Sequence, residues 1–374
     1  MRTEPIGLYV HIPFCLKKCN YCDFCSFSEL SEKQRKDYIS CLIKEIKSYR
    51  DEDKISIDTI FFGGGTPSLL TSEEFISIIR EIENSFNICE NAEFTIEANP
   101  KTLTREKLKT YVSCGVNRIS IGMQTIHENE RKILGRVHNF QDFKTAYQLV
   151  LDAGIENVNV DIMYGIPEQT LESFKKTLET VVVLNPAHIS AYGLILEEGT
   201  RFWKSKDRLM FPSEDSECMM YNFACEFLAL HGYKHYEISN YAKPSMESRH
   251  NLKYWRNQKY IGVGISAYSY FNSKRYGNTS KISEYLSDNS AKYSSGEVID
   301  SESEAYEYVM LGLRLSEGIS LSEYKRRFGK DFLFGKEEKI NAYINTGYII
   351  KTQDRIALTE KGFYVSNAIL TELL

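Results

Sequence analysis

The feature that most limits the fold of this chain is an alternation of short apolar segments with longer amphipathic ones along its first half. Six segments rich in β-branched or aromatic residues have the length of buried strands: 8–12, 58–62, 93–97, 118–122, 157–161 and 188–192. Between them lie stretches of helical period such as 33–49, 72–86 and 170–184. This alternation predicts right-handed βαβ units and a parallel sheet, either open or closed into a barrel.

Polar and glycine-rich residues follow these expected strands. A GGGTP segment at 63–67 follows the second, Glu97 ends the third, Gln124 follows the fourth and Asp161 ends the fifth. Parallel α/β folds place their chemistry at the carboxyl ends of the strands, so the clustering predicts a binding site at that edge. Taken alone, the glycine run is equally well explained as a turn. Asp161, taken alone, is equally well explained as a helix cap.

Cysteines are concentrated behind the first expected strand, where Cys15, Cys19, Cys22 and Cys25 fall within eleven positions. The total of nine is odd, which fits a disulfide framework poorly. Structural zinc sites usually pair two cysteine knuckles, and no second knuckle follows here. The remaining cysteines are expected to be small buried hydrophobic residues: Cys41, Cys89, Cys114, Cys218 and Cys225. Three close thiolates would hold three irons of a [4Fe–4S] cube and leave the fourth iron open.

Composition excludes a generally basic, nucleic-acid-binding surface, because the net charge is −5. A length of 374 residues predicts two domains or one barrel with an appendage. No secretory pattern opens the chain and no apolar run is long enough to span a membrane. We therefore expect a cytoplasmic protein whose thiols are reduced.

The pattern changes after residue 200. Residues 211–233 predict a helix, and 236–244 predict a strand with a turn. Near the C-terminus, a helical segment, a short hairpin over 348–350 and 355–358, and a terminal helix are typical of a small winged-helix-like unit.

This pattern divides the chain into three expected parts. A barrel core covers 1–200 and carries the cysteine loop 15–25. An α+β extension covers 201–298 and carries an HNxxYW element, and a winged-helix-like domain covers 299–374.

Segments along the whole chain resemble one family. They are YVHIPFCLKKCNYCDF, FFGGGTPSLL, TIEANPKTLT, GVNRISIGMQT, LGRVHN, NVDIMYGIPEQT and GLRLSEG. The spacing C-x3-C-x2-C is the signature of the radical S-adenosylmethionine (SAM) superfamily. The whole set resembles its HemN/HemW branch, which contains oxygen-independent coproporphyrinogen III dehydrogenases and heme chaperones, and it is most similar to the HemW group.

The resemblance implies a partial (β/α)6 radical SAM barrel, a [4Fe–4S] cluster and SAM, which the reduced cluster cleaves to a 5′-deoxyadenosyl radical in the family. It implies that the cluster is bound by Cys15, Cys19 and Cys22. Positions that match SAM-binding residues of the family are Tyr9, Tyr21, Gly64, Gly65, Thr66, Glu97, Gln124, Arg136 and Asp161. These residue types suit the task, because glycines let a backbone approach a ligand and carboxylates accept hydrogen bonds from hydroxyls or amines. No catalytic residue is assigned.

Two departures separate this chain from the dehydrogenases of the branch. They carry a further cysteine two residues after the third, where this chain has Phe24, as the HemW group does. They also carry an extension before the first strand, whereas only eight residues precede Tyr9 here. Both departures argue against porphyrinogen decarboxylation, and Cys25 is expected to be a bystander.

The HNLKYW segment at 250–255 matches an element shared by the HemW group. Imidazole is a good axial ligand for heme iron and aromatic rings cover a porphyrin face, so His250 is the candidate heme ligand. The alternative is a structural, hydrogen-bonded histidine. Less favoured candidates are His188, His231 and His235, whereas His11 is expected to order the cysteine loop. Relatives often carry a histidine where this chain has Tyr268, which weakens a literal transfer of heme ligands.

The leading hypothesis is a heme-chaperone-like radical SAM protein that binds a [4Fe–4S] cluster, SAM and heme and delivers heme to client proteins. Its expected partners are heme, heme-requiring proteins and a reductant such as flavodoxin or ferredoxin, with no nucleic acid and at most peripheral membrane contact. The alternatives are an oxygen-independent coproporphyrinogen III dehydrogenase, another radical SAM enzyme acting on a tetrapyrrole, and a partner-binding protein whose cluster is structural.

Overall fold

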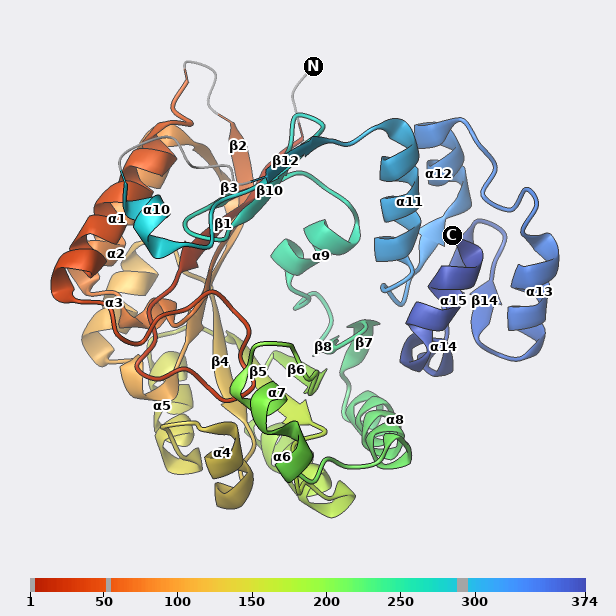
Figure 1. Ribbon diagram of the computed structural model, residues 1–374, viewed down its shortest axis with the longest axis horizontal. Helices are drawn as coiled ribbons and strands as arrows, with labels where there is room; N and C mark the ends of the chain where they lie inside the picture. The colour runs from red at the N-terminus through yellow and green to blue at the C-terminus, as the bar shows by residue number, and fades with distance from the viewer. Residues whose placement is uncertain (1–3, 52–54, 288–294) are drawn as a thin grey trace.

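The computed structural model describes residues 4–51, 55–287 and 295–374 (Figure 1). Six parallel strands lie side by side in chain order: β1 (Ile6–Ile12), β2 (Ser56–Gly64), β3 (Asn87–Ala98), β4 (Arg118–Gln124), β5 (Asn157–Tyr164) and β6 (His188–Gly193). Each expected strand lies inside one of them. The expected parallel sheet and partial (β/α)6 barrel are therefore confirmed.

Helices follow these strands and cover the outer side of the curved sheet (Figure 1). They are α1 (Glu32–Lys47), α2 (Ser72–Ser85), α3 (Arg105–Ser113), α4 (Glu128–Leu134), α5 (Phe140–Asp152) and α6 (Leu171–Leu184), with short 3-10 turns η1 (Pro67–Leu69) and η2 (Pro100–Thr102). Reciprocal capping boxes begin several of them, for example between Thr71 and Glu74 at α2. The apolar faces of the helices pack on outward-pointing strand residues such as Leu8 and Val10, which are fully buried.

The opposite, inner face of the sheet is polar. Thr59, Thr95, Ser120, Asn159 and Ser190 all lie there and are buried. Because successive strand residues alternate between the two faces, the same strands supply an apolar core outside and a hydrogen-bonding surface inside. The inner face is thus prepared for polar ligands near the carboxyl ends of the strands.

The segment after β6 widens the sheet at both edges. It contains α7 (Arg201–Ser205), η3 (Lys206–Arg208), α8 (Glu214–Leu230), β7 (Lys234–Glu237), β8 (Asn240–Ala242), α9 (Arg249–Trp255), β9 (Tyr260–Val263), β10 (Tyr268–Phe271), β11 (Lys274–Gly277), α10 (Ile282–Leu286) and β12 (Ser295–Val298). Strand β8 pairs antiparallel with β6, and β9 pairs parallel with β1. In the described residues the sheet reads β12-β11-β10-β9-β1-β2-β3-β4-β5-β6-β8-β7. Residues 288–294 of the expected extension lie outside the described residues.

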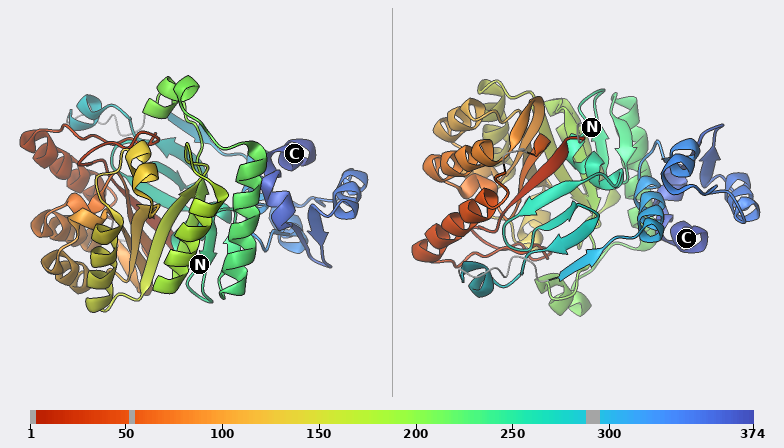
Figure 2. Two further views of the ribbon diagram at one scale, coloured as in Figure 1. Left: turned by 90° about the horizontal axis from the view of Figure 1, so that it is seen from below. Right: turned by 90° about the horizontal axis from the view of Figure 1, so that it is seen from above.

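The C-terminal segment stands beside the barrel, as Figure 2 shows in blue. Its elements are α11 (Ser301–Gly312), β13 (Ile319–Ser320), α12 (Leu321–Phe328), α13 (Glu337–Asn345), β14 (Ile349–Lys351), β15 (Arg355–Leu358), α14 (Glu360–Tyr364) and α15 (Ser366–Leu373). Strands β13, β15 and β14 form a small antiparallel sheet that contains the expected hairpin. Helices α11 and α14 contact α9 and α8, respectively, which joins this segment to the rest of the chain.

In the parts of the chain that the structure describes, no helix is both long enough and apolar enough to cross a membrane.

Candidate functional site

The cysteine loop leaves β1 at the carboxyl end of the sheet and is anchored at both ends. The Cys15 amide donates to the Phe27 carbonyl (3.0 Å) and the Phe27 amide donates to the Pro13 carbonyl (2.7 Å). In the middle of the loop, the Asn20 amide donates to the Leu134 carbonyl at the end of α4 (3.0 Å). Backbone contacts therefore hold a segment that has no regular secondary structure of its own.

A pocket of about 310 Å³ opens between this loop and the ends of β2 to β6. Its lining includes most of the expected site residues: Cys15, Cys19, Cys22, Tyr21, Gly64, Gly65, Thr66, Glu97, Gln124, Arg136 and Asp161. These residues come from positions spread over about 150 residues of sequence, and the parallel topology brings them together.

The three thiols of the loop face this pocket and carry no disulfide. Burial, together with the neighbouring thiols of Cys19 and Cys15, raises the pKa of Cys22 to about 11. Burial likewise raises the pKa of Cys15. A bound metal cation deprotonates thiols and compensates the charge of neighbouring thiolates, so the donor set fits an iron–sulfur cluster.

Cys25 lies outside the lining of this pocket. Its Sγ contacts the Ser280 carbonyl oxygen at 3.6 Å, and its own carbonyl accepts a hydrogen bond of 2.8 Å from His11 Nε2. His11 thus orders the loop, as its position on β1 indicated. Phe24, in contrast, lines the pocket and is 62% exposed.

The glycine turn after β2 packs directly against the cysteine loop. Gly65 and Thr66 donate backbone hydrogen bonds of 2.8 and 2.7 Å to the carbonyls of Ile12 and Phe14. Gly64 has φ +108°, and a Cβ there would lie 2.5 Å from the His11 ring. A Cβ on Gly65 would lie 2.7 Å from the Phe14 carbonyl oxygen. Only glycine fits at these two positions, and the result is a bare backbone surface on which a ligand can lie.

Two carboxylates face the pocket from β3 and β5. Burial and the nearby charge of Asp161 together raise the pKa of Glu97 to about 8. The Gly64 amide donates to Glu97 Oε2 at 3.2 Å. Asp161 accepts hydrogen bonds from Asn159 Nδ2 (2.7 Å) and Ser120 Oγ (3.0 Å). A cation placed between the two carboxylates would relieve their repulsion, so this side of the pocket suits a positively charged ligand.

Gln124 and Arg136 bring unpaired polar atoms to the same wall. A bulge at the end of β4 gives Gln124 a φ of +72°, and within the described residues its buried Oε1 has no hydrogen-bond partner. The same is true of the buried Nε of Arg136, whose Nη2 donates to the Gly122 carbonyl (2.6 Å) and whose Nη1 lies 3.7 Å from Cys19 Sγ. Orphaned polar atoms of this kind are rare and are expected where a ligand completes the site.

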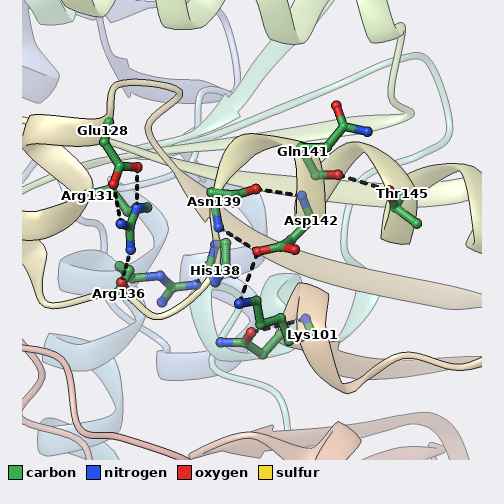
Figure 3. A network of polar contacts seen from close by, with 10 residues as sticks. Lys101, Glu128, Arg131, Arg136, His138, Asn139, Gln141, Asp142 and Thr145 are labelled. Atoms are coloured by element: carbon green, nitrogen blue, oxygen red, sulfur yellow. Dashed lines mark hydrogen bonds and ion pairs between the residues drawn. The ribbon is translucent and has the colours of Figure 1, made fainter.

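Arg136 is held from behind by a polar network, which Figure 3 shows. Its backbone carbonyl accepts a hydrogen bond from Arg131, and Arg131 is paired with Glu128 on the same short helix. Arg136 also approaches His138 Nε2 at 3.5 Å. The network orients a cationic side chain toward the cysteine loop without neutralising it.

Two expected site residues do not line the pocket. The hydroxyl of Tyr9 is 3.0 Å from His11 Nδ1, one layer below the glycine turn. His250 is 1% exposed and uses both ring nitrogens: Nδ1 is 2.9 Å from Thr59 Oγ1 and Nε2 is 2.8 Å from the Tyr254 hydroxyl. The imidazole of His250 is therefore buried, and both of its ring nitrogens already have hydrogen-bond partners. This geometry favours the alternative, a structural histidine, and His250 as a heme ligand stays a prediction.

The pocket also contains residues that sequence reasoning did not assign: Lys17, Lys18, Asn99, Ser120, Gly122, Met163 and Tyr192. Tyr192 follows Ser190 at the end of β6, so its place on a strand end was a usable signal. Ser120 had no such signal, because a serine within a strand is ordinary. Tyr268, the residue found in place of a histidine, lies across from Gly277 in the β10–β11 pair and its ring covers that glycine.

A three-cysteine loop at the carboxyl ends of a parallel half-barrel is the arrangement of radical SAM proteins. Residues 9–181 match the Radical SAM superfamily, and residues 299–365 match the HemN C-terminal domain. Among solved structures, coproporphyrinogen III oxidase (HemN) from Escherichia coli superposes with a TM-score of 0.85 at 22% identity, covering 99% of this chain and 90% of that one. That likeness shows the fold.

Similarity over the full length defines the family more narrowly. The Heme chaperone HemW of Lactococcus lactis is 36% identical over 100% of this chain and 98% of its own length. The HemW proteins of Bacillus subtilis and Escherichia coli are 34% and 33% identical over 98% and 99% of this chain. The chain belongs to the HemW family of the radical SAM superfamily, and membership in that superfamily implies a [4Fe–4S] cluster and SAM.

Proposed function

We propose that this protein binds a [4Fe–4S] cluster, SAM and heme and delivers the heme to heme-requiring client proteins. The observation that carries the proposal is the full-length similarity to proteins named heme chaperones. In this proposal it acts in the cytoplasm, touches membranes only peripherally, and receives electrons from a reductant such as flavodoxin or ferredoxin. Its parts are the core 1–200, the extension 201–298 and the C-terminal domain 299–374.

The cluster ligands in this proposal are Cys15, Cys19 and Cys22. A cluster with one open iron supplies a binding point for the amine and carboxylate of SAM and the electron for sulfonium cleavage. Around that point the bare turn at Gly64 and Gly65 gives the ligand a backbone surface. Arg136 and Tyr21 keep a charged and an aromatic group beside the thiols, 3.4 Å from each other.

In this proposal Glu97 and Asp161 favour a positively charged ligand. SAM carries a sulfonium and, at neutral pH, an ammonium group, and two facing carboxylates stabilise such cations. The unpaired Oε1 of Gln124 offers one further acceptor on the same wall. These residues bind and orient the cofactor, and we assign no proton transfer to them.

Heme is placed by this proposal in a second cavity, of about 910 Å³, between α9 and the C-terminal helices. The HNLKYW helix turns His250 toward the sheet and brings Trp255 to the wall of this cavity, which Tyr270 and Tyr308 also line. The aromatic rings offer faces to a porphyrin. The propionate groups of heme would meet four arginines that line the cavity: Arg256, Arg326, Arg327 and Arg355.

Glu317 occupies the place of a ligand carboxylate in this cavity. It pairs with Arg256 at 3.1 Å and with Arg355 at 3.7 Å. A heme propionate that replaces this glutamate would take over both arginines and loosen the contact between α9 and the C-terminal segment. Binding of heme and movement of that segment are thereby coupled in the proposal.

The test is a heme titration of the purified protein followed by transfer to a heme-free client. We expect near-stoichiometric binding in the Soret band, and a loss of affinity of at least tenfold when Arg256 and Arg355 are both replaced by Ala. The control is Arg80→Ala, because Arg80 is an exposed residue of α2 outside the cavity. Absence of stoichiometric heme binding in the wild-type protein would refute the chaperone proposal.

The second candidate is an oxygen-independent coproporphyrinogen III dehydrogenase, favoured by the fold shared with HemN. Phe24 argues against it, since it stands at the pocket mouth where those enzymes carry a further cysteine. Anaerobic incubation with coproporphyrinogen, SAM and a reductant distinguishes the two, because only the dehydrogenase forms protoporphyrinogen with stoichiometric 5′-deoxyadenosine.

A further inference from the structure

A second group of metal-binding side chains lies far from the cysteine loop. Cys225 of α8, His235 of β7 and Glu360 of α14 each offer one ligand atom, and the three atoms lie within 4.8 Å of one another. The Cys225 Sγ and His235 Nδ1 atoms are 3.9 Å apart. In Figure 1 these three elements meet where the C-terminal segment joins the barrel.

His235, which is half-buried, differs from the buried His188 and His250 in its hydrogen bonding. His188 uses both ring nitrogens, at 2.6 Å from Asn159 Oδ1 and 2.8 Å from the Tyr236 hydroxyl, and His250 is equally saturated. The Nδ1 atom of His235 has a long contact to Cys225, and the ring also interacts with the backbone of Glu237 and Ile238, whereas within the described residues the buried Nε2 atom has no hydrogen-bond partner. An imidazole that lacks the two strong hydrogen bonds of His188 and His250 keeps a ring nitrogen available for an ion.

Neighbouring aromatic residues hold the side chains of His235 and Cys225 in place. The His235 ring stacks on Tyr241 with centroids 4.3 Å apart and packs edge-on against Phe363 at 5.4 Å. The Tyr241 hydroxyl lies 3.2 Å from Cys225 Sγ. Hydrogen bonds from surrounding groups orient the ligands of metal sites, and the Tyr241 hydroxyl is placed to act in this way on the Cys225 sulfur.

Solvent reaches this group from one side. A shallow pocket of about 500 Å³ is lined by His235, Glu360, Phe363 and Lys361, among others. The Lys361 ammonium points elsewhere, over the Tyr348 ring at 4.3 Å and toward the Thr346 carbonyl at 3.3 Å. The pocket therefore gives a cation an entry path without a fixed positive charge at its end.

We propose that Cys225, His235 and Glu360 form a zinc site that ties the C-terminal segment to helix α8. One sulfur, one imidazole and one carboxylate are ligands that zinc accepts, whereas magnesium and calcium prefer oxygen alone. Three protein ligands leave a fourth, solvent-facing position for water. On binding, the thiol proton of Cys225 passes to solvent and the sulfur bonds to the cation as a thiolate.

The test uses the full-length protein with its iron–sulfur cluster rebuilt, so that the cysteine loop is filled before zinc is added. The protein is equilibrated with Zn²⁺, passed over a weak chelator, and analysed for zinc content and by X-ray absorption at the zinc edge. We expect one zinc per chain, with one sulfur at about 2.3 Å and the remaining ligands nitrogen or oxygen at about 2.0–2.2 Å.

Variants locate the ion. His235→Ala and Glu360→Gln are expected to lower zinc affinity at least tenfold, and Cys225→Ala is expected also to remove the sulfur from the zinc shell. The matched controls are Cys218→Ala and His231→Ala, on α8 and at its end, which are expected to keep the ion. Glu360→Gln is informative even if the other two variants fold poorly. Glu360 is exposed, and glutamine has nearly the same size as glutamate, so this substitution is not expected to disturb folding.

Three results would overturn the proposal. One is less than about a tenth of an equivalent of zinc in the cluster-loaded protein. Another is zinc retention that none of the three ligand substitutions changes. The last is a shell of three sulfurs, which would place zinc in the cysteine loop instead.

Discussion

The Nε2 atom of His250 lies 2.8 Å from the hydroxyl oxygen of Tyr254, one helical turn further along α9. This pair accounts for the His and Tyr positions of the HNxxYW element, because residues four apart lie on the same face of a helix. That face packs on the inner side of the sheet, where the His250 ring stacks on Phe61 at 5.2 Å. The final Trp255 points away from it, into the cavity beside the C-terminal helices. The element therefore joins a buried, hydrogen-bonded histidine to the cavity that we propose for heme.

Replacement of His250 by Ala is predicted to lower the free energy of unfolding by about 2–4 kcal/mol, since it removes a buried ring and leaves Thr59 and Tyr254 without partners. Denaturant unfolding measures this loss. His231→Ala is the control, because His231 is exposed at the end of α8 and its replacement is expected to cost about 0.5 kcal/mol or less. A His250→Ala protein of wild-type stability that has lost heme binding would contradict the structural role.

The same substitution carries a pH signature. Burial lowers the pKa of His250 to about 3, below its unfolded value near 6.5. Below pH 6.5 the unfolded chain takes up a proton at this site while the folded protein does not, so the stability that the neutral ring contributes declines as pH falls toward 3. The difference in unfolding free energy between wild type and His250→Ala is therefore expected to be smaller at pH 5 than at pH 7.

Substitutions of Cys19 and Cys25 are predicted to have opposite effects on the iron content of the protein. Cys19→Ser is expected to lose the iron–sulfur absorption and most of the bound iron after anaerobic reconstitution, because only two of the three proposed cluster ligands, Cys15 and Cys22, remain. Cys25→Ser is expected to keep about four irons per chain, since the Cys25 thiol contacts the Ser280 carbonyl outside the pocket. Iron analysis of the two proteins, prepared side by side, measures this difference. Loss of the cluster in Cys25→Ser would make Cys25 a fourth ligand and leave no open iron.

Gly64→Ala is predicted to weaken SAM binding at least tenfold and to destabilise the protein. Its φ of +108° disfavours any side chain, and the new Cβ would lie 2.5 Å from the His11 ring that orders the cysteine loop. Gly154→Ala is a matched control, because Gly154 also has a positive φ (+86°) but open space around its Cβ position. Calorimetric titration with SAM is expected to show wild-type affinity for the control, and equal effects of both substitutions would refute the role of close approach.

Sequence reasoning predicted the parallel strands and the grouping of Cys15, Gly64, Glu97 and Asp161, because chain topology alone brings strand ends to one edge. It did not predict which way a side chain on α9 points. That direction depends on Thr59, which is 191 residues earlier in the chain, and such long-range packing leaves no local pattern. His235 and Glu360 were missed as neighbours for the same reason.

The last prediction concerns Glu97, whose pKa burial and the nearby charge of Asp161 raise to about 8. At pH 7 the free protein therefore holds a proton on Glu97. A cationic ligand favours the carboxylate, so SAM binding at pH 7 is expected to expel that proton, and affinity is expected to rise with pH until Glu97 is ionised near pH 8. Because the ammonium group of SAM can itself titrate in this range, the control is Glu97→Gln, which retains the titration of the ligand alone. The pH dependence of affinity, measured by calorimetry in buffers of different ionisation enthalpy, is expected to be steeper in the wild type between pH 6.5 and 8. Identical profiles for the two proteins would show that Glu97 does not meet the cation.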